Sequence, residues 1–368
     1  MIEANEKLFE PILEKIKVDT SREYPFHELH CMVFSKDEEK VFFQNISEID
    51  VQELFYGVYA SLLMCDESYY LVVNNRTIDI YNAHENDFIE ICEEYDSSFF
   101  LYLSLKGRIS FKEDKLISIY DNLLYKEDEI YTDFEYFSSN QKKIRKHSFE
   151  KLKGYFEDFK IFKILDDDFF LNHNGKLDIF NLLSFLLIEK NSMGRVPFEE
   201  QSLSKFYDIS IEKNPYIPYE FIMESLLAIR WKHIFKDLYR CIEALYAFPK
   251  AQKFIEDIEY PNIMEIEKVI LSLEEKLGWR PTEQQALQEL LTFLDEKSIE
   301  NFLIVYPYDG DKKVEYIAKK IYRLRNSLVH YRKALYSEEN NLSDEQWNQL
   351  IRSMLIFIQK IYKEMYRE

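Results

Sequence analysis

Apolar residues recur at three- and four-residue steps through the second half of the chain, which is the period of helices that bury one face. In the segment 317–335 the apolar stripe consists of Ile317, Ile321, Leu324, Leu328 and Leu335. Pro249 bounds the first such segment, and Ser343 with Gln346 three residues later forms a helix-start signal before the last. The pattern predicts helices over residues 220–248, 262–277, 282–294, 297–305, 317–335 and 343–366.

The first part of the chain contains short runs of aromatic and β-branched residues separated by turn residues. These runs predict β-hairpins over residues 29–44, 69–81 and 99–112. Helical spacing predicts two helices among them, over residues 3–17 and 50–65. The predicted fold class is therefore α+β: an N-terminal α+β domain with an antiparallel sheet, followed by an all-α helical C-terminal domain.

Prolines cluster between residues 191 and 218 and mark the predicted boundary between the domains. A cut near residue 215 gives an α+β domain over residues 1–215, to which we assign a regulatory or sensing role. The helical domain then covers residues 216–368. A subdivision of the first domain near residues 140–165 stays open, because the pattern there is mixed.

The formal net charge is −20, which argues against a protein that coats nucleic acid generally, because phosphate binding depends on clustered Lys and Arg. Between Lys312 and Lys333, however, eight Lys or Arg residues stand against one acid, Glu315. This basic segment is either an anion-binding surface or a solvated helix face beside an acidic neighbouring domain.

Four cysteines, Cys31, Cys65, Cys92 and Cys241, are widely spaced without a C-x-x-C pair, as expected of reduced thiols in the cytosol. The N-terminal segment is acidic and unlike a secretory leader. No apolar run approaches the ~18 residues of a membrane span, and the run at 179–188 is predicted to be a buried element. We expect a cytoplasmic protein that does not enter the membrane.

Two groups of residues could ligate a metal ion. His27, His30 and Cys31 lie at a predicted strand start, where the two histidines would point to opposite faces. The three aspartates at 166–168 could serve a metal-dependent nuclease, or they are a solvated charge run. Seven glycines and the absence of a Gly-rich phosphate-binding motif argue against a nucleotide-binding loop. We expect no cofactor and no metal.

The predicted helix over residues 317–335 carries the hexapeptide Arg325-Asn326-Ser327-Leu328-Val329-His330. At about 100° per residue, Asn326 and His330 lie roughly 40° apart on the polar face, whereas Arg325 lies about 140° from His330. Only the long arginine side chain, or a partner helix, could bring guanidinium and imidazole together. This motif has an Arg-Asn pair followed by a His, and it lies on the penultimate helix of a helical domain. In these features the chain resembles the HEPN superfamily, whose ribonucleases carry an Arg, then four to six residues, then a His.

The resemblance covers roughly residues 220–366 and implies a metal-independent endoribonuclease that acts as a homodimer, with the motifs of two chains across one groove. It implies catalytic roles for Arg325, Asn326 and His330. Glu243 is a secondary candidate, at the place of an acidic residue that some members carry. Basic and aromatic side chains near the motif are expected to bind RNA; they are Lys319, Tyr322, Arg323, Arg332 and Lys333.

These residue types suit metal-free RNA cleavage. The reaction needs a base for the 2′-hydroxyl proton, a proton donor for the 5′ oxygen and a cation for the phosphorane charge. An imidazole with a pKa near ~6.5 can act as base or acid, and a guanidinium binds phosphate through two donors.

The resemblance also implies transfer or messenger RNA as the substrate, and a role in abortive infection against phage or in a toxin–antitoxin pair. An antitoxin or a phage-derived trigger would then be a further partner. An alternative of a different class is a non-catalytic helical module for dimerisation or interaction. It is motivated by the wide apolar stripe between Trp347 and Met365 on the last predicted helix.

Overall fold

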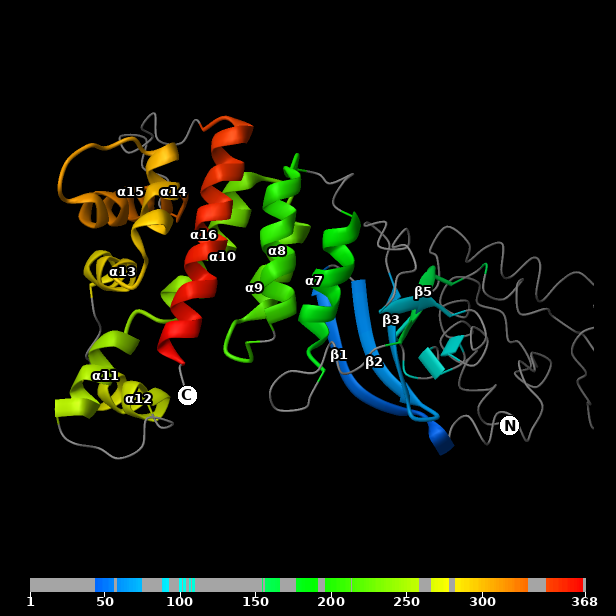
Figure 1. Cartoon of the computed structure of the whole chain (residues 1–368). Helices are drawn as coiled ribbons and strands as arrows, with labels where there is room; N and C mark the ends of the chain where they lie inside the picture. Colours follow the sequence, from blue (N-terminus) through cyan, green and yellow to red (C-terminus); the bar gives the residue numbers. More distant parts are fainter. Residues whose placement is uncertain are drawn as a thin grey trace, which may run out of the picture. The chain divides into compact units, whose positions relative to one another are not determined.

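The computed structural model divides the chain into two compact units, Met1–Asp167 and Asp168–Glu368 (Figure 1). The first unit contains an antiparallel sheet and the second is helical, which confirms the predicted α+β class. The structure describes residues 44–55, 58–74, 88–92, 99–100, 102–103, 106, 108–109, 154, 156–165, 177–190, 196–212, 214–257, 266–277, 282–329 and 342–366.

The described residues of the first unit form a five-stranded sheet in the order β1-β2-β3-β5-β4, with every neighbouring pair antiparallel. The strands are β1 (Ser47–Phe55), β2 (Val58–Cys65), β3 (Ser68–Asn74), β4 (Ile89–Ile91) and β5 (Phe159–Ile164). β3 lies at the centre, where Leu71 pairs with Leu62 of β2 and with Phe162 of β5. All three side chains are buried, so the core of this unit joins segments that are far apart in the sequence.

A two-residue turn joins β2 to β3. Asp66 and Glu67 both have positive φ, at 48° and 63°. This left-handed geometry suits the twist of a tight hairpin, although it is strained for residues other than glycine or asparagine. The Asn45 amide donates to Asp66 Oδ1 over 2.6 Å and so supports the turn.

The segment 50–65, predicted as a helix, forms β1 and β2 instead. The prediction depended on the spacing of Leu54, Val58 and Leu62, but residues four apart share a face in a strand as well as in a helix. Every residue from Ala60 to Leu63 is buried. A strand covered on both faces buries consecutive residues in this way, whereas an amphipathic helix buries only a stripe.

β3 confirms the first strand of the hairpin predicted over residues 69–81. Its two edges carry β2 and β5, so the predicted pairing of this strand with the residues that follow it is wrong. Residues 75–81 lie outside the described part of the chain.

The strand predicted at the start of 99–112 is also wrong. The described residues there, Phe99, Phe100, Tyr102 and Leu103, are helical and buried. The Lys106 amide donates to the Tyr102 carbonyl over 3.0 Å, as in a helical turn. Burial at these four positions follows helical spacing, which the β-forming residue types concealed.

The second unit consists, in its described part, of α7 (Ile179–Lys190), α8 (Glu200–Glu212), α9 (Tyr219–Leu227), α10 (Trp231–Glu243), α11 (Phe248–Asp257), α12 (Ile266–Leu277), α13 (Glu283–Leu291), α14 (Glu296–Val305), α15 (Lys313–Val329) and α16 (Asp344–Met365). The long α16 packs against α8, α10 and α14 (Figure 1). α7 packs against α8 and α9, and α13 packs against α15. α16 is thus the helix around which the unit is assembled.

α16 begins where the sequence predicts. The Ser343 side chain accepts a hydrogen bond from the Gln346 amide, and the Gln346 side chain accepts one from the Ser343 amide, which is the predicted capping box. The predicted apolar stripe is buried inside the unit; it comprises Trp347, Leu350, Ile351, Met354, Leu355, Ile358, Ile361 and Met365. The stripe is therefore core, and it does not supply the exposed pairing surface on which the interaction-module alternative depended.

The single helix predicted over residues 220–248 is interrupted. The backbone is extended at Ala228 and Arg230, which separates α9 from α10. Ile229 lies in this break and is 51% exposed. Pro249 lies in the first turn of α11 and does not end the preceding helix, because first-turn residues need no amide donor.

The division at Asp167 and Asp168 falls well before the boundary predicted near residue 215. α7 and α8 belong to the helical unit because they pack against α9 and α16. The run 179–188 is buried as predicted, within α7. The prolines that suggested a linker lie between helices of one unit.

Asn348 on α16 fixes the position of the segment that leads into α8. Its side chain is 1% exposed, accepts hydrogen bonds from Glu199 N and Ser202 Oγ, and donates to the carbonyls of Pro197 and Asp344. Both acceptor and both donor positions of the amide are therefore used.

The helices predicted over 282–294 and 297–305 correspond to α13 and α14, and α12 lies within the helix predicted over 262–277. In the region 140–165, which was left mixed, the described residues include β5. Four of the predicted features lie outside the described residues. They are the helix over 3–17, nearly all of the hairpin over 29–44, the group at His27, His30 and Cys31, and the aspartates at 166–168.

Candidate functional site

α15 carries the predicted site. Its buried residues include Ile317, Ala318, Ile321 and Leu324, and the helix packs against α10, α13 and α14. This apolar stripe sets which side chains turn inward and which remain at the surface. The described part of α15 ends at Val329; His330, Arg332 and Lys333 lie outside the described residues.

Arg325 points into the helical unit, and its side chain is 17% exposed. Its Nη2 lies 3.1 Å from Glu243 Oε1 on α10, and its Nη1 lies 3.3 Å from Glu283 Oε2 on α13. One guanidinium therefore joins three helices. With two carboxylates on one cation, the group carries an excess of one formal negative charge.

Tyr239 contacts the guanidinium of Arg325 and is itself in contact with a second tyrosine, Tyr246. Arg325 Cζ lies 5.7 Å from the centre of the Tyr239 ring, within the range of a cation–π contact. The Tyr246 hydroxyl donates to the Tyr239 hydroxyl. Burial raises the pKa of both tyrosines well above the usual value of about 10, so both hydroxyls stay neutral and supply hydrogen bonds without adding charge.

Asn326 contributes to the orientation of the same guanidinium. Its Oδ1 accepts a hydrogen bond from Arg325 Nη1 over 3.1 Å. Tyr322, one turn earlier, is half-buried. Lys319 and Arg323 are exposed, and neither has an ion-pair partner among the residues that the structure describes.

The structure thus brings together three of the predicted residues, Arg325, Asn326 and Glu243. Glu283 and Tyr239 were not predicted. Tyr239 lies four residues before Glu243 on α10, so helical spacing places the two on one face and could have indicated it. Glu283 lies in the first turn of α13, and no signal in the sequence pairs that position with Arg325.

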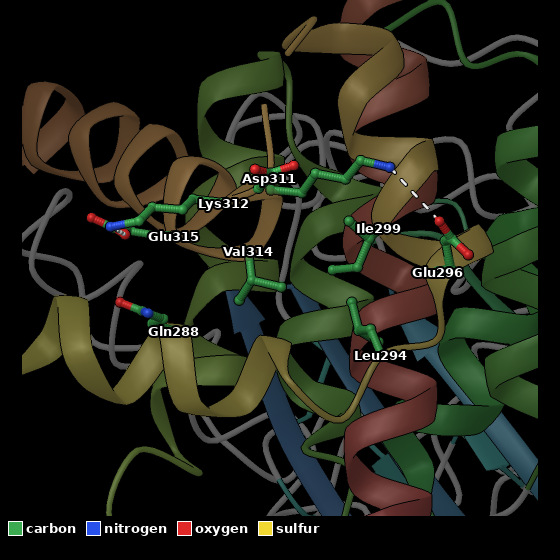
Figure 2. Close-up of a pocket in the computed structure, with 9 residues that line it drawn as sticks. Gln288, Leu294, Glu296, Ile299, Asp311, Lys312, Val314 and Glu315 are labelled. Carbon is green, nitrogen blue, oxygen red and sulfur yellow. Dashed lines mark ion pairs between the residues drawn. The ribbon is translucent and has the colours of Figure 1, made fainter. Parts of the chain in front are cut away.

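A pocket of about 380 Å³ lies near the start of α15, against α13 and α14 (Figure 2). Leu294, Ile299 and Val314 supply apolar lining, and charged side chains of both signs surround them; Lys313 Nζ lies 3.8 Å from Glu296 Oε1. Lys313 is about 18 Å along the helix from Arg325, at 1.5 Å per residue. The pocket is therefore separate from the Arg325 group, and its mixed, paired charges favour no class of ligand.

Within the described ranges, no group of three or more His, Cys, Asp or Glu side chains is arranged to hold a metal ion. None of the described helices combines the length and apolar character required to cross a membrane. Comparisons with protein-family models, curated proteins and solved structures found no match for this chain.

α15 therefore presents two kinds of cation. Arg325 is oriented and partly neutralised, so an anion would have to compete with Glu243 and Glu283 for its donors. Lys319 and Arg323 are exposed and open to a phosphate. The helix can bind an anionic chain along its outer face and present a fixed guanidinium at its inner edge.

Proposed function

We propose that this protein is a metal-independent endoribonuclease of the HEPN type, which acts as a homodimer with Arg325, Asn326 and His330 from both copies around the scissile phosphate. The observation that carries the proposal is the orientation of Arg325 by Glu243 and Asn326, on the helix that bears the Arg-x4-His motif. An oriented guanidinium suits a transition state whose charge develops at a defined place.

In the proposed reaction one imidazole takes the proton from the 2′-hydroxyl, and the 2′ oxygen attacks phosphorus. The 5′ oxygen leaves with a proton from a second donor, which yields a 2′,3′-cyclic phosphate and a 5′-hydroxyl. Arg325 stabilises the phosphorane charge. On the helix predicted from the sequence, Arg325 and His330 diverge by about 140°, so in this proposal two chains complete the site.

The exposed cations Lys319 and Arg323 support an anionic substrate in a chain whose net charge is −20. Transfer or messenger RNA is the proposed substrate. We place the activity in phage defence by abortive infection or in a toxin–antitoxin pair, in the cytoplasm. In this scheme the N-terminal unit restrains the nuclease until an antitoxin or phage-derived trigger changes state.

Incubation of the full-length protein with total RNA and with transfer RNA, with and without EDTA, tests the proposal. We expect cleavage that persists in EDTA and falls roughly 10²- to 10⁴-fold in His330→Ala, the usual effect of removing a general acid or base. His233→Ala, at an exposed histidine on α10, is the matched control and should cleave normally.

Arg325→Ala should also abolish cleavage. Arg352 provides its control, because that arginine is similarly shielded on α16 and pairs with Glu199. If Arg325→Ala and Arg352→Ala lost activity equally, the loss would reflect damage to the helical unit and the catalytic assignment would be wrong.

Two other outcomes contradict the proposal. Absence of any cleavage at high protein concentration favours the non-catalytic interaction module. Activity that disappears in EDTA favours a metal-dependent nuclease that uses the aspartates at 166–168.

A further inference from the structure

An ordered aromatic pair lies at the start of α15. The rings of Tyr308 and Tyr316 stack with their centres 4.4 Å apart and their planes 12° apart. Both side chains are half-buried, so both keep exposed surface. Lys320 Nζ lies 5.5 Å from the centre of the Tyr316 ring and 5.9 Å from that of Tyr306, which adds a positive charge to the aromatic group.

Gly310 allows the loop before α15 to lie against Tyr308. A Cβ atom at Gly310 would be 2.4 Å from the Tyr308 hydroxyl oxygen and 2.5 Å from Cζ. Since the Tyr308 ring is held by its stack on Tyr316, a side chain at position 310 would displace the ring. The sequence of the loop therefore permits the stacked arrangement.

The outer face of α15 continues from this pair toward the motif. Tyr316, Lys319, Arg323 and Asn326 follow at steps of three and four residues, so they form one row along the helix. The row spans about 15 Å from Tyr316 to Asn326 at 1.5 Å per residue. Lys319 and Arg323, in its middle, are the exposed cations that lack an ion-pair partner among the described residues.

We infer that this row is the binding track for single-stranded RNA, and that the Tyr308–Tyr316 pair stacks an unpaired base at the end of the track that lies about 15 Å along the helix from Asn326. The inference deepens the proposed function and rests on it for the position of the cut. Aromatic rings beside a line of cations are the usual means by which proteins hold single strands without reading their sequence.

Single-stranded RNA fits the row better than two other anionic partners. A duplex keeps its bases paired and stacked on one another, so it would gain nothing from the two tyrosines. An acidic protein segment would use Lys319 and Arg323 but would not depend on a stacked aromatic pair. The tyrosines are therefore the residues that separate these partners.

Binding of a fluorescent single-stranded RNA of about 12 nucleotides, within the usual range of site sizes, provides the test. The measurement uses the full-length His330→Ala protein, so that the RNA stays intact. Tyr316→Ala and Tyr308→Ala should each weaken binding roughly tenfold, and Tyr316→Phe should bind normally because it keeps the ring. Gly310→Ala should weaken binding by displacing Tyr308. The RNA duplex should show no such dependence.

Tyr216→Ala is the matched control, because Tyr216 is another solvent-accessible tyrosine in a stacked pair, with its ring centre 3.7 Å from that of Tyr366. It should leave RNA binding unchanged. Lys319→Ala and Arg323→Ala should each reduce the slope of log affinity against log salt by about 0.7, whereas Lys253→Ala on α11 should not.

The outcomes separate this inference from the proposed function. If the wild-type protein cleaves RNA but the tyrosine variants bind and cleave as well as it does, the track is wrong and the nuclease stands. If nothing is cleaved but binding depends on Tyr308 and Tyr316, the nuclease is wrong and the track stands. Equal loss of single-strand and duplex binding in Tyr316→Ala would overturn the stacking role.

Discussion

Arg325 is both the proposed catalytic arginine and a residue that links three helices. Its guanidinium is paired with Glu243 and Glu283, touches the Tyr239 ring and bonds to Asn326. Removal of a largely buried cation from such a group is costly, because two neighbouring, partly buried carboxylates then lose their counter-ion. The residue therefore has a structural role that precedes any catalytic one.

We predict that Arg325→Ala lowers the free energy of unfolding by about 1–3 kcal/mol, because it leaves two carboxylates near one another without their cation. Arg325→Lys should recover only part of this, since one ammonium cannot replace two guanidinium donors at two carboxylates. Urea denaturation of the purified variants measures the effect. Arg323→Ala, at an exposed cation two residues earlier, should change stability by less than about 0.5 kcal/mol. Equal midpoints for the Arg325→Ala and wild-type proteins would show that the ion pairs contribute nothing.

Sequence reasoning at this scale identified Arg325, Asn326 and Glu243, which the structure places in contact, and missed Glu283. The first three share a motif or a resemblance, which a sequence can display. Glu283 reaches Arg325 only through the packing of α13 on α15, and such a contact has no local sequence signal. Local periodicity states which face of a helix is buried but not which helix covers it.

Among the elements, the helices with clear start signals were predicted best. α16 begins at Ser343 because a reciprocal pair of hydrogen bonds with Gln346 satisfies amides that would otherwise lack partners. α14 begins after Asp295, whose side chain accepts from the Ser298 amide. Signals of this kind lie within four residues, so they can be identified without the fold.

We predict that Ser343→Ala destabilises the protein by about 1 kcal/mol, the usual effect of removing a serine cap. Ser343→Thr and Ser343→Asp, which keep an oxygen for the Gln346 amide, should recover most of the loss. Thermal denaturation followed by circular dichroism compares the three. A Ser343→Ala protein as stable as Ser343→Asp would mean that water replaces the cap at no cost.

The strands were harder to predict, and the reason is geometric. The β1–β2 segment repeats apolar residues at four-residue steps, which strands and helices share, and the helical residues Phe99, Phe100 and Tyr102 are aromatic types that favour strands. In both places burial by the rest of the first unit decided the conformation. Tertiary packing overrides local preference most readily in short segments of this kind.

At the scale of the whole molecule, the division of the chain departs from the sequence-based boundary. Prolines suggested residue 215, whereas the contacts place the division between Asp167 and Asp168. Proline marks where a helix starts or stops, and an all-helical unit contains many such places. α7 and α8 therefore belong with the helices that follow them.

This division predicts the behaviour of two fragments. A fragment of residues 168–368 should fold cooperatively, whereas one of residues 216–368 should not, because the loss of α7 and α8 uncovers the faces of α9 and α16 on which they pack. Circular dichroism and thermal denaturation of both fragments make the comparison. A cooperative transition of similar midpoint in residues 216–368 would favour the boundary at 215.

Asn348 restricts how α16 can be aligned within the helical unit, and its amide occupies a buried place where an apolar side chain could pack. Helices packed through Leu, Ile and Phe alone can slide by one turn, about 5.4 Å, and still bury nearly the same surface. A slide of α16 past the segment before α8 would break the bonds to Glu199, Ser202 and Pro197 together and leave a buried amide unsatisfied. Asn348 thus selects one alignment among several that the hydrophobic effect alone would treat as nearly equivalent.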